Sequence, residues 1–145
     1  MPRSNIQLGG QELKLDADAD TSITVDTDDQ IDIKIAGSDK LKIDASSHLV
    51  TTTAGTSNLV LGVNAGNSIQ SGGNNNTLVG DEAGTAITTG DRNTAVGFEA
   101  LKTVSTGSYN VAVGYQALEN NTGDNNTAIG DQALEANTSG SNNTA

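Results

Sequence analysis

The sequence predicts an all-β protein in which a short N-terminal β-meander is followed by a parallel β-solenoid. Three observations support this fold class. A five-residue motif recurs along the C-terminal two thirds, apolar and polar residues alternate near the N-terminus, and bulky side chains are scarce. Only 34% of the 145 residues are hydrophobic, and Phe98, Tyr109 and Tyr115 are the only aromatic residues. A conventional globular core is therefore not expected.

The N-terminal part begins with residues 1–12, which contain the one proline and no periodic pattern. We expect an irregular docking arm there. Over residues 13–44, the segments SITV, QIDIKI and KLKID alternate apolar and polar residues, as half-buried strands do, and the Asp- and Gly-rich links DTDD and AGSD favour turns. These features predict a three-stranded meander. Its apolar face would consist of Ile23, Val25, Ile31, Ile33, Ile35, Leu41 and Ile43.

Residues 45–57 are small and hydroxylic, which predicts a linker. Residues 58–145 then carry a repeat that is incomplete at the C-terminus, and glycines mark it at steps of 18, 17, 17 and 16 residues. The asparagine column is Asn58, Asn76, Asn93, Asn110, Asn126 and Asn143, and the glycine column is Gly62, Gly80, Gly97, Gly114 and Gly130. A further column has glycine in the first two repeats and leucine at Leu101, Leu118 and Leu134, so the last three repeats are expected to be better filled.

A period near 17 fits two short strands and two turns, which make one flattened coil of a β-solenoid of about five coils. Stacked coils would bring each asparagine over the next, where identical amides can hydrogen-bond, and the glycines would allow tight corners or close backbone approach. The alternative is that EALK (99–102) and the two QALE segments form helical turns, but isolated turns of that length are unstable. One coil contains few large side chains, so we expect an obligate homo-oligomer.

Composition argues against several other classes. The net charge of −11 disfavours binding to nucleic acid or to anionic membranes. Cysteine is absent, and the single histidine, His48, cannot form a multi-histidine metal site. No signal peptide or membrane-spanning segment is apparent.

No catalytic, cofactor-binding or metal-binding residue can be assigned from the sequence. Asp16, Asp18 and Asp20 alternate as in the start of a calcium loop, but Thr21 and Thr27 stand where that loop needs glycine and glutamate. No serine has a partnered histidine. The segment GGNNNTLVG (72–80) lacks the lysine and the second glycine of a phosphate-binding loop. We therefore expect neither enzymatic activity nor a cofactor.

The repeats NTAVGFEAL (93–101), NVAVGYQAL (110–118) and NTAIGDQAL (126–134) resemble those of phage tail-fibre and related fibre proteins. They are also similar to repeats in the heads of trimeric autotransporter adhesins. The resemblance covers residues 58–145 and implies an intertwined homotrimer built as a left-handed parallel β-roll. Residues 11–39 also resemble N-terminal pieces of phage structural proteins.

The resemblance implies a virion protein that forms a tail, collar or head fibre. Residues 1–50 would bind other virion proteins, and the repeats would form a stalk for a distal, host-binding part outside this chain. Assembly in the host cytoplasm and release by lysis would account for the absence of an export signal. Two alternatives are a fragment of a bacterial trimeric surface adhesin and an ice-binding solenoid, the latter suggested by Thr77, Thr94, Thr127 and Thr144.

Overall fold

The computed structural model describes residues 13–14, 22–25, 31–35, 38–43, 49–51 and 54–145, and the chain forms two compact units, Met1–Thr52 and Thr53–Ala145. All elements of regular structure in these residues are strands, which confirms the all-β class. No helix long and apolar enough to cross a membrane occurs among them. The expected arm over 1–12, the aspartates at 16, 18 and 20, and His48 lie outside the described residues.

The N-terminal unit is an antiparallel sheet with strands in chain order. The strands are β1 (Leu13–Lys14), β2 (Ser22–Val25), β3 (Ile31–Ile35), β4 (Ser38–Ile43) and β5 (Leu49–Thr51). Ile33 pairs with Ile23 on one side and with Leu41 on the other, so apolar positions are in register across three strands. The sheet has two more strands than the expected meander, and β5 lies in the range expected to be a linker. Both extra strands are too short to show a clear alternation.

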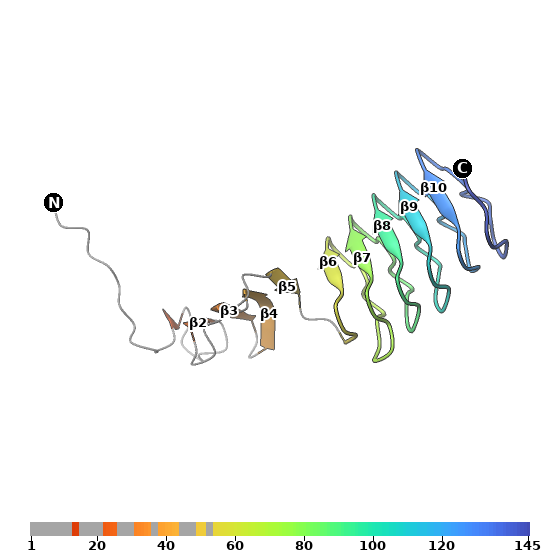
Figure 1. Cartoon of the computed structure of the whole chain (residues 1–145). Coiled ribbons are helices and arrows are strands. Elements are labelled where there is room, and N and C mark those ends of the chain that lie inside the picture. The colour runs from red at the N-terminus through yellow and green to blue at the C-terminus, as the bar shows by residue number, and fades with distance from the viewer. Residues whose placement is uncertain (1–12, 15–21, 26–30, 36–37, 44–48, 52–53) are drawn as a thin grey trace. The chain divides into compact units, whose positions relative to one another are not determined.

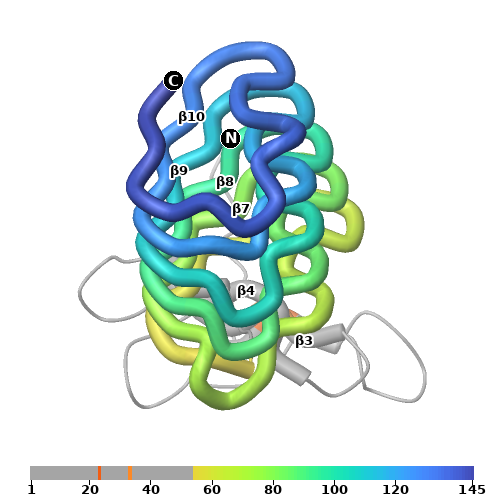
Figure 2. The backbone as a smooth tube through the Cα atoms, turned by 90° about the vertical axis from the view of Figure 1, so that its right-hand side faces the viewer, coloured from red at the N-terminus to blue at the C-terminus, as the bar shows by residue number. Residues whose placement is uncertain are grey.

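The C-terminal unit is a parallel β-solenoid with roughly 17 residues per coil, as predicted. Its five strands are connected by about four turns of the solenoid. Each coil contributes one strand of three residues, and Figure 1 shows these strands side by side in chain order. The strands are β6 (Leu59–Leu61), β7 (Thr77–Val79), β8 (Thr94–Val96), β9 (Val111–Val113) and β10 (Thr127–Ile129). Figure 2 looks along the stack and shows each coil lying over the previous one. We name each coil after its strand; the coils span residues 57–74, 75–91, 92–108, 109–124 and 125–141.

Strand register is set by the repeat. Leu78 pairs with Ala95, which pairs with Ala112, so equivalent residues lie over one another. The middle residue of each strand from β7 to β10 points inward and is fully buried, whereas the two flanking residues face outward, as period-two alternation requires. The inward row is occupied mainly by alanine because the coil is thin.

The side of the coil opposite the strand differs from the expected second strand. Its N–H groups alternate: Ala83 donates to Gly80 in its own coil at 3.3 Å, and Gly84 donates to Ala100 in the next coil at 2.9 Å. Glu99 and Leu101 there have φ of 56° and 52°, which belongs to neither a strand nor a right-handed helical turn. This conformation also excludes the helical alternative for EALK. The sequence did not predict this left-handed backbone, because its side chains favour helix. The stacking of the coils decides the backbone conformation instead.

In each coil one large core side chain lies either in the middle of the strand or at the position opposite it. We call this side chain the bulky centre, and its position changes along the stack. In the β7 coil Leu78 fills the core from the strand and Ile87 from the opposite side, while Gly84 makes room between them. A Cβ added at Gly84 would lie 2.8 Å from Ile87 Cδ1 and from Leu78 Cδ2. In the β8 coil these three positions are Ala95, Leu101 and Val104, all fully buried. The first repeats are therefore as well filled as the later ones, contrary to the expectation from the leucine column alone.

The glycines that follow the strands are required by the stacking distance. Gly97 has φ of 139°, and a Cβ added there would lie 2.3 Å from the carbonyl oxygen of Gly114 in the next coil. Such a contact is impossible without displacing the backbone. Gly130 has no further glycine of the column stacked on it, and a Cβ added there would lie 3.9 Å from the nearest atom. Both the backbone angle and the close approach of coils thus favour glycine.

We predict that the core positions exchange as a set. Leu78→Ala alone should lower the free energy of unfolding by roughly 2–5 kcal/mol because it leaves a cavity. The triple variant Leu78→Ala, Gly84→Leu, Ile87→Val reproduces the β8 set in the β7 coil and should recover most of that loss. Urea denaturation followed by circular dichroism measures both. A triple variant less stable than Leu78→Ala would contradict the compensation.

Candidate functional site

The described part of the chain has no pocket and no cluster of residues able to hold a metal ion. Its chemistry is distributed along the stack as rows of equivalent side chains. Three features stand out: buried hydrogen-bond ladders at the corner before each strand, a charged row on one side, and an exposed apolar face over the strands. Each is built from residues that recur at the repeat period.

The six column asparagines form a continuous ladder at the corner that precedes the strand. Asn93 illustrates the bonding: its Oδ1 accepts the backbone N–H of Asn110 in the next coil at 3.0 Å, and its Nδ2 donates to the carbonyl of Gly107 in its own coil at 2.9 Å. The oxygen therefore aligns the next coil, and the amide nitrogen closes its own. The equivalent backbone contact joins all six asparagines.

The stacked amides expected from the sequence hydrogen-bond to one another at the last three of the five junctions between column asparagines. Bonds between amide side chains occur only in the later coils, for example from Asn126 Nδ2 to Asn110 Oδ1 at 3.2 Å. The partners present at each level are backbone groups. Asn76, Asn93, Asn110 and Asn126 have no exposed surface, so these bonds satisfy polar groups that water does not reach. An aspartate could accept the N–H but could not donate to the glycine carbonyl.

A second ladder, missed by the sequence analysis, lies two residues before the first. The side-chain oxygen of Asp91 accepts the N–H of Asn74 at 2.7 Å, and Ser108 Oγ accepts the N–H of Asp91 at 3.0 Å. Here the oxygen belongs to the later coil, so the bonds run opposite to those of the asparagine ladder. The column consists of Thr56, Asn74, Asp91, Ser108, Asp124 and Ser141. Its signal is a short side chain with an oxygen at one repeat position, whatever the residue type.

Asparagine also enters the core where earlier coils have Ile69, Ile87 and Val104. Asn121 is fully buried, and its Oδ1 accepts from Asn126 Nδ2 at 3.1 Å and from Asn137 Nδ2 at 2.9 Å. Its own Nδ2 donates to the carbonyl of Gly123 at 3.0 Å. The interior of the last two coils is thus partly polar but hydrogen-bonded, so burying the amide there costs little.

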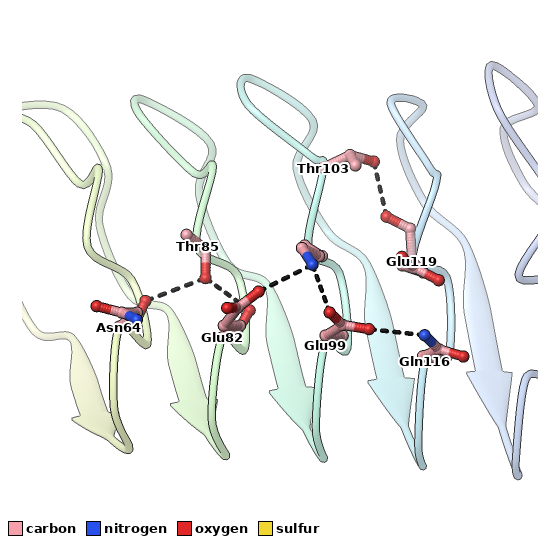
Figure 3. A network of polar contacts seen from close by, with 8 residues as sticks. Asn64, Glu82, Thr85, Glu99, Thr103, Gln116 and Glu119 are labelled. Atoms are coloured by element: carbon pink, nitrogen blue, oxygen red, sulfur yellow. Dashed lines mark hydrogen bonds and ion pairs between the residues drawn. The ribbon is translucent and has the colours of Figure 1, made fainter.

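A charged row crosses the coils on the side after the strand (Figure 3). Lys102 Nζ lies 2.8 Å from Glu82 Oε2 in the previous coil and also contacts Glu99 Oε1 in its own coil. Glu99 Oε2 accepts from Gln116 Nε2 in the next coil at 2.6 Å. One lysine therefore bridges two glutamates at the same repeat position, whose carboxylates would otherwise repel each other. Interactions of this row connect three successive coils.

These contacts change the protonation of the row. Hydrogen bonds from Lys102 and Gln116 lower the pKa of Glu99 below its ordinary value. The two glutamates raise the pKa of Lys102 above its ordinary value. Glu99 and Lys102 are therefore both charged at neutral pH. Lys102 would lose its contribution only well into the alkaline range.

The strand face is the outward surface over β6–β10. It has four columns of residues at alternate positions: an entry column just before the asparagines, the first and third strand residues, and an exit column just after the glycine. The third-residue column is Leu61, Val79, Val96, Val113 and Ile129, and the exit column is Val63, Asp81, Phe98, Tyr115 and Asp131. Val63 is 69% exposed and Ile129 is 64% exposed. A stripe of large apolar side chains therefore follows the length of the stack, which is typical of an interaction surface.

No family model matches this sequence, and neither a curated protein nor a solved structure matches it significantly. The resemblance to fibre and adhesin repeats is therefore carried by the repeat motifs alone. Function has to be inferred from the geometry of the solenoid.

The asparagine ladder predicts a large cost for a small deletion. Asn93→Ala leaves the Asn110 N–H and the Gly107 carbonyl without their partners, at roughly 1–3 kcal/mol for each buried group. Urea denaturation should show this loss of stability. Asn67→Ala is the control, because Asn67 is exposed and lies outside both ladders. Equal effects of the two substitutions would show that the ladder does not stabilise the fold.

The charged row predicts a loss of stability in acid. Because the folded-state pKa of Glu99 is lowered from 4.5, the unfolded chain binds more protons in this range, and stability falls as the pH drops through and below about 4.5. Glu99→Gln should make this pH dependence shallower by roughly the contribution of one carboxylate. The dependence is measured as the change in the thermal midpoint between pH 6 and pH 3. The control is Glu119→Gln, a glutamate without an ion pair among the described residues. If both variants keep the wild-type slope, Glu99 is not responsible.

Proposed function

We propose that this protein is a structural element of a phage fibre, on the tail, collar or head of the virion, in which the solenoid forms part of a stalk. The strand face carries this proposal, since a stalk assembled from several chains needs an apolar surface that extends along its axis. The ladders and the close stacking of coils suit a rigid spacer.

The strand face also supports the proposal that copies associate. Eight of the ten residues in its third-residue and exit columns are exposed large hydrophobics or half-buried valines. Leaving this stripe in water would be unfavourable. Its central part contains no charged residue, so burial against an equivalent stripe would desolvate no charge there. A homotrimer is the arrangement that the repeat resemblance implies. In that assembly the N-terminal unit would bind other virion proteins, and host binding would belong to a distal part outside this chain.

Two alternatives are distinguished from this proposal by different observations. An adhesin fragment would share the same solenoid, and the complete reading frame would distinguish it by an export signal and a membrane anchor. An ice-binding face needs flat rows of threonine. The threonine column on the strand face is interrupted by Leu59 and Val111, and the column beside it is aliphatic.

Presence in the particle tests the virion proposal. Mass spectrometry of phage particles purified to homogeneity should detect peptides from both units of the chain. Immunogold labelling against the solenoid should mark a fibre. Particles free of this protein would rule the proposal out.

Self-association through the strand face predicts a specific disruption. Val96→Lys and Val113→Lys together place two charges in the middle of the apolar stripe and should convert the oligomer to monomer in sedimentation velocity. Thr103→Lys is the control, because this exposed residue lies on the opposite side of the coil. Circular dichroism should remain that of the folded solenoid for both variants. A wild-type protein that is monomeric at micromolar concentration would refute association.

A further inference from the structure

The aromatic residues of the solenoid are concentrated at the two edges of the strand face. Phe98 and Tyr115 occupy the exit column, and Tyr109 lies in the entry column next to Arg92. All four residues belong to the β8 and β9 coils. The other entry positions are Ser57, Asn75, Asn125 and Asn142, and the other exit positions are Val63, Asp81 and Asp131. The middle of the stack therefore has a distinct pair of edges.

Each edge is organised within the chain. Arg92 Nη1 donates to Tyr109 Oη at 2.8 Å, and the guanidinium carbon lies 5.3 Å from the centre of the Tyr109 ring. The rings of Phe98 and Tyr115 are stacked with centroids 5.5 Å apart and planes 10° apart. Phe98, Tyr109 and Tyr115 are 41%, 51% and 47% exposed. Both edges thus present ordered aromatic groups that no described part of the chain covers.

The entry edge pays a conformational cost for these residues. Arg92 has φ of 56° and Tyr109 has φ of 60°, a left-handed conformation that asparagine tolerates better than large side chains do. Asparagine occupies this position in three of the other four coil entries. Neither side chain contributes to the core, since Arg92 and Tyr109 are both exposed. Folding of the single chain therefore gives no reason to have them there.

Arg92 contacts the Tyr109 ring, but its charge has no carboxylate partner in the described part of the chain. Arg92 and Lys102 are the only basic residues in 54–145, against eight acidic ones. Lys102 is held by two glutamates, whereas no described carboxylate forms an ion pair with Arg92. The guanidinium therefore retains donors for a partner.

The two edges are at the same level of the stack. Arg92 and Phe98 are six residues apart in one coil, at opposite sides of the strand face. A coil rises about 4.8 Å over its whole length, so these residues differ by only about 2 Å along the axis. Copies arranged in a ring around an axis parallel to the stack, with strand faces inward, would bring the entry edge of one copy against the exit edge of the next.

Resting on the association proposed above, we propose that Arg92 and Tyr109 of one copy pack against Phe98 and Tyr115 of the neighbouring copy. The occupant of each edge is thus a second copy of this chain. The contact joins two different edges, and it closes into a ring when every copy repeats it. It also offers Arg92 an aromatic face and, one coil away on the same exit column, the exposed carboxylate of Asp81.

Cross-linking tests this pairing, and the absence of cysteine in the chain makes it clean. Asn125→Cys and Asp131→Cys, at the entry and exit positions of the β10 coil, would be combined in one chain, which keeps the four proposed contact residues, and treated with a short bis-maleimide. The double variant should give covalent species up to the closed ring on a denaturing gel. Each single variant alone should stay monomeric, whereas single variants refolded together should give dimers. Within one chain the two cysteines are six residues apart along the strand face, roughly 20 Å at the rise of an extended chain, which is beyond the reach of a short reagent.

The outcomes separate this inference from the association itself. Oligomers in sedimentation velocity without a cross-link in the double variant would overturn the edge pairing alone. Cross-links in the single variants would show a two-fold contact and would also overturn it. A monomeric protein would overturn both proposals. Thr103→Cys with Asp131→Cys is the control pair, because Thr103 lies away from the strand face, and it should give no ring.

The backbone cost of Tyr109 supplies a second readout. Tyr109→Asn restores the residue type of the neighbouring coils, so in the monomeric Val96→Lys, Val113→Lys background it should leave the thermal midpoint unchanged or raise it. In the oligomer it should weaken association about tenfold or more, since a buried interface tyrosine often contributes this much. Destabilisation of the monomer together with unchanged association would contradict the proposed role.

Discussion

The solenoid depends on the hydrogen bonds that connect the corner of each coil to the corner of the next. A coil of 17 residues with one three-residue strand cannot satisfy its own backbone or bury its own side chains. Asn93 satisfies backbone groups in two coils, because its amide nitrogen bonds the Gly107 carbonyl of its own coil and its oxygen accepts the N–H of Asn110 in the next. The second bond also aligns the coils, so that each can bury its side chains against its neighbours. The other features of the stack require this alignment. Without it, the inward alanines and the close glycine contacts would not coincide.

The same alignment explains how a thin core can be tightly packed. Between the middle strand residue and the position opposite it, each coil has room for one large side chain. The chain supplies it from the strand up to the β7 coil and from the opposite side from the β8 coil onward. Leu78 with Gly84, followed by Ala95 with Leu101, illustrates this change of side. Substitution at one of these positions is therefore a change in a set, and its effect depends on the other members.

Much of the fold could be predicted from the sequence, because asparagine and glycine recur at positions where only they fit. The strand residues were also predictable from their alternation. The corner column of Asp91 and Ser108 was not, since any short side chain with an oxygen can serve, and the residue type therefore varies. The left-handed backbone at Leu101 was hidden for a different reason: leucine favours helix, and only the contacts between coils impose the conformation. The extra strands β1 and β5 are too short to show a period.

The two corner ladders have opposite polarity, and this has a consequence for how such a chain can change in length. Between any two coils, one side chain of the lower coil accepts from the upper, and one of the upper coil accepts from the lower. Every junction between adjacent coils therefore has the same two kinds of bond from a backbone N–H to a side-chain oxygen at its corner. Removing or duplicating one whole repeat would create no new kind of junction there, so a gene could shorten or lengthen the rod in increments of one layer. Only the place where the bulky centre changes sides, between Gly84 and Leu101, would limit which layers can be exchanged.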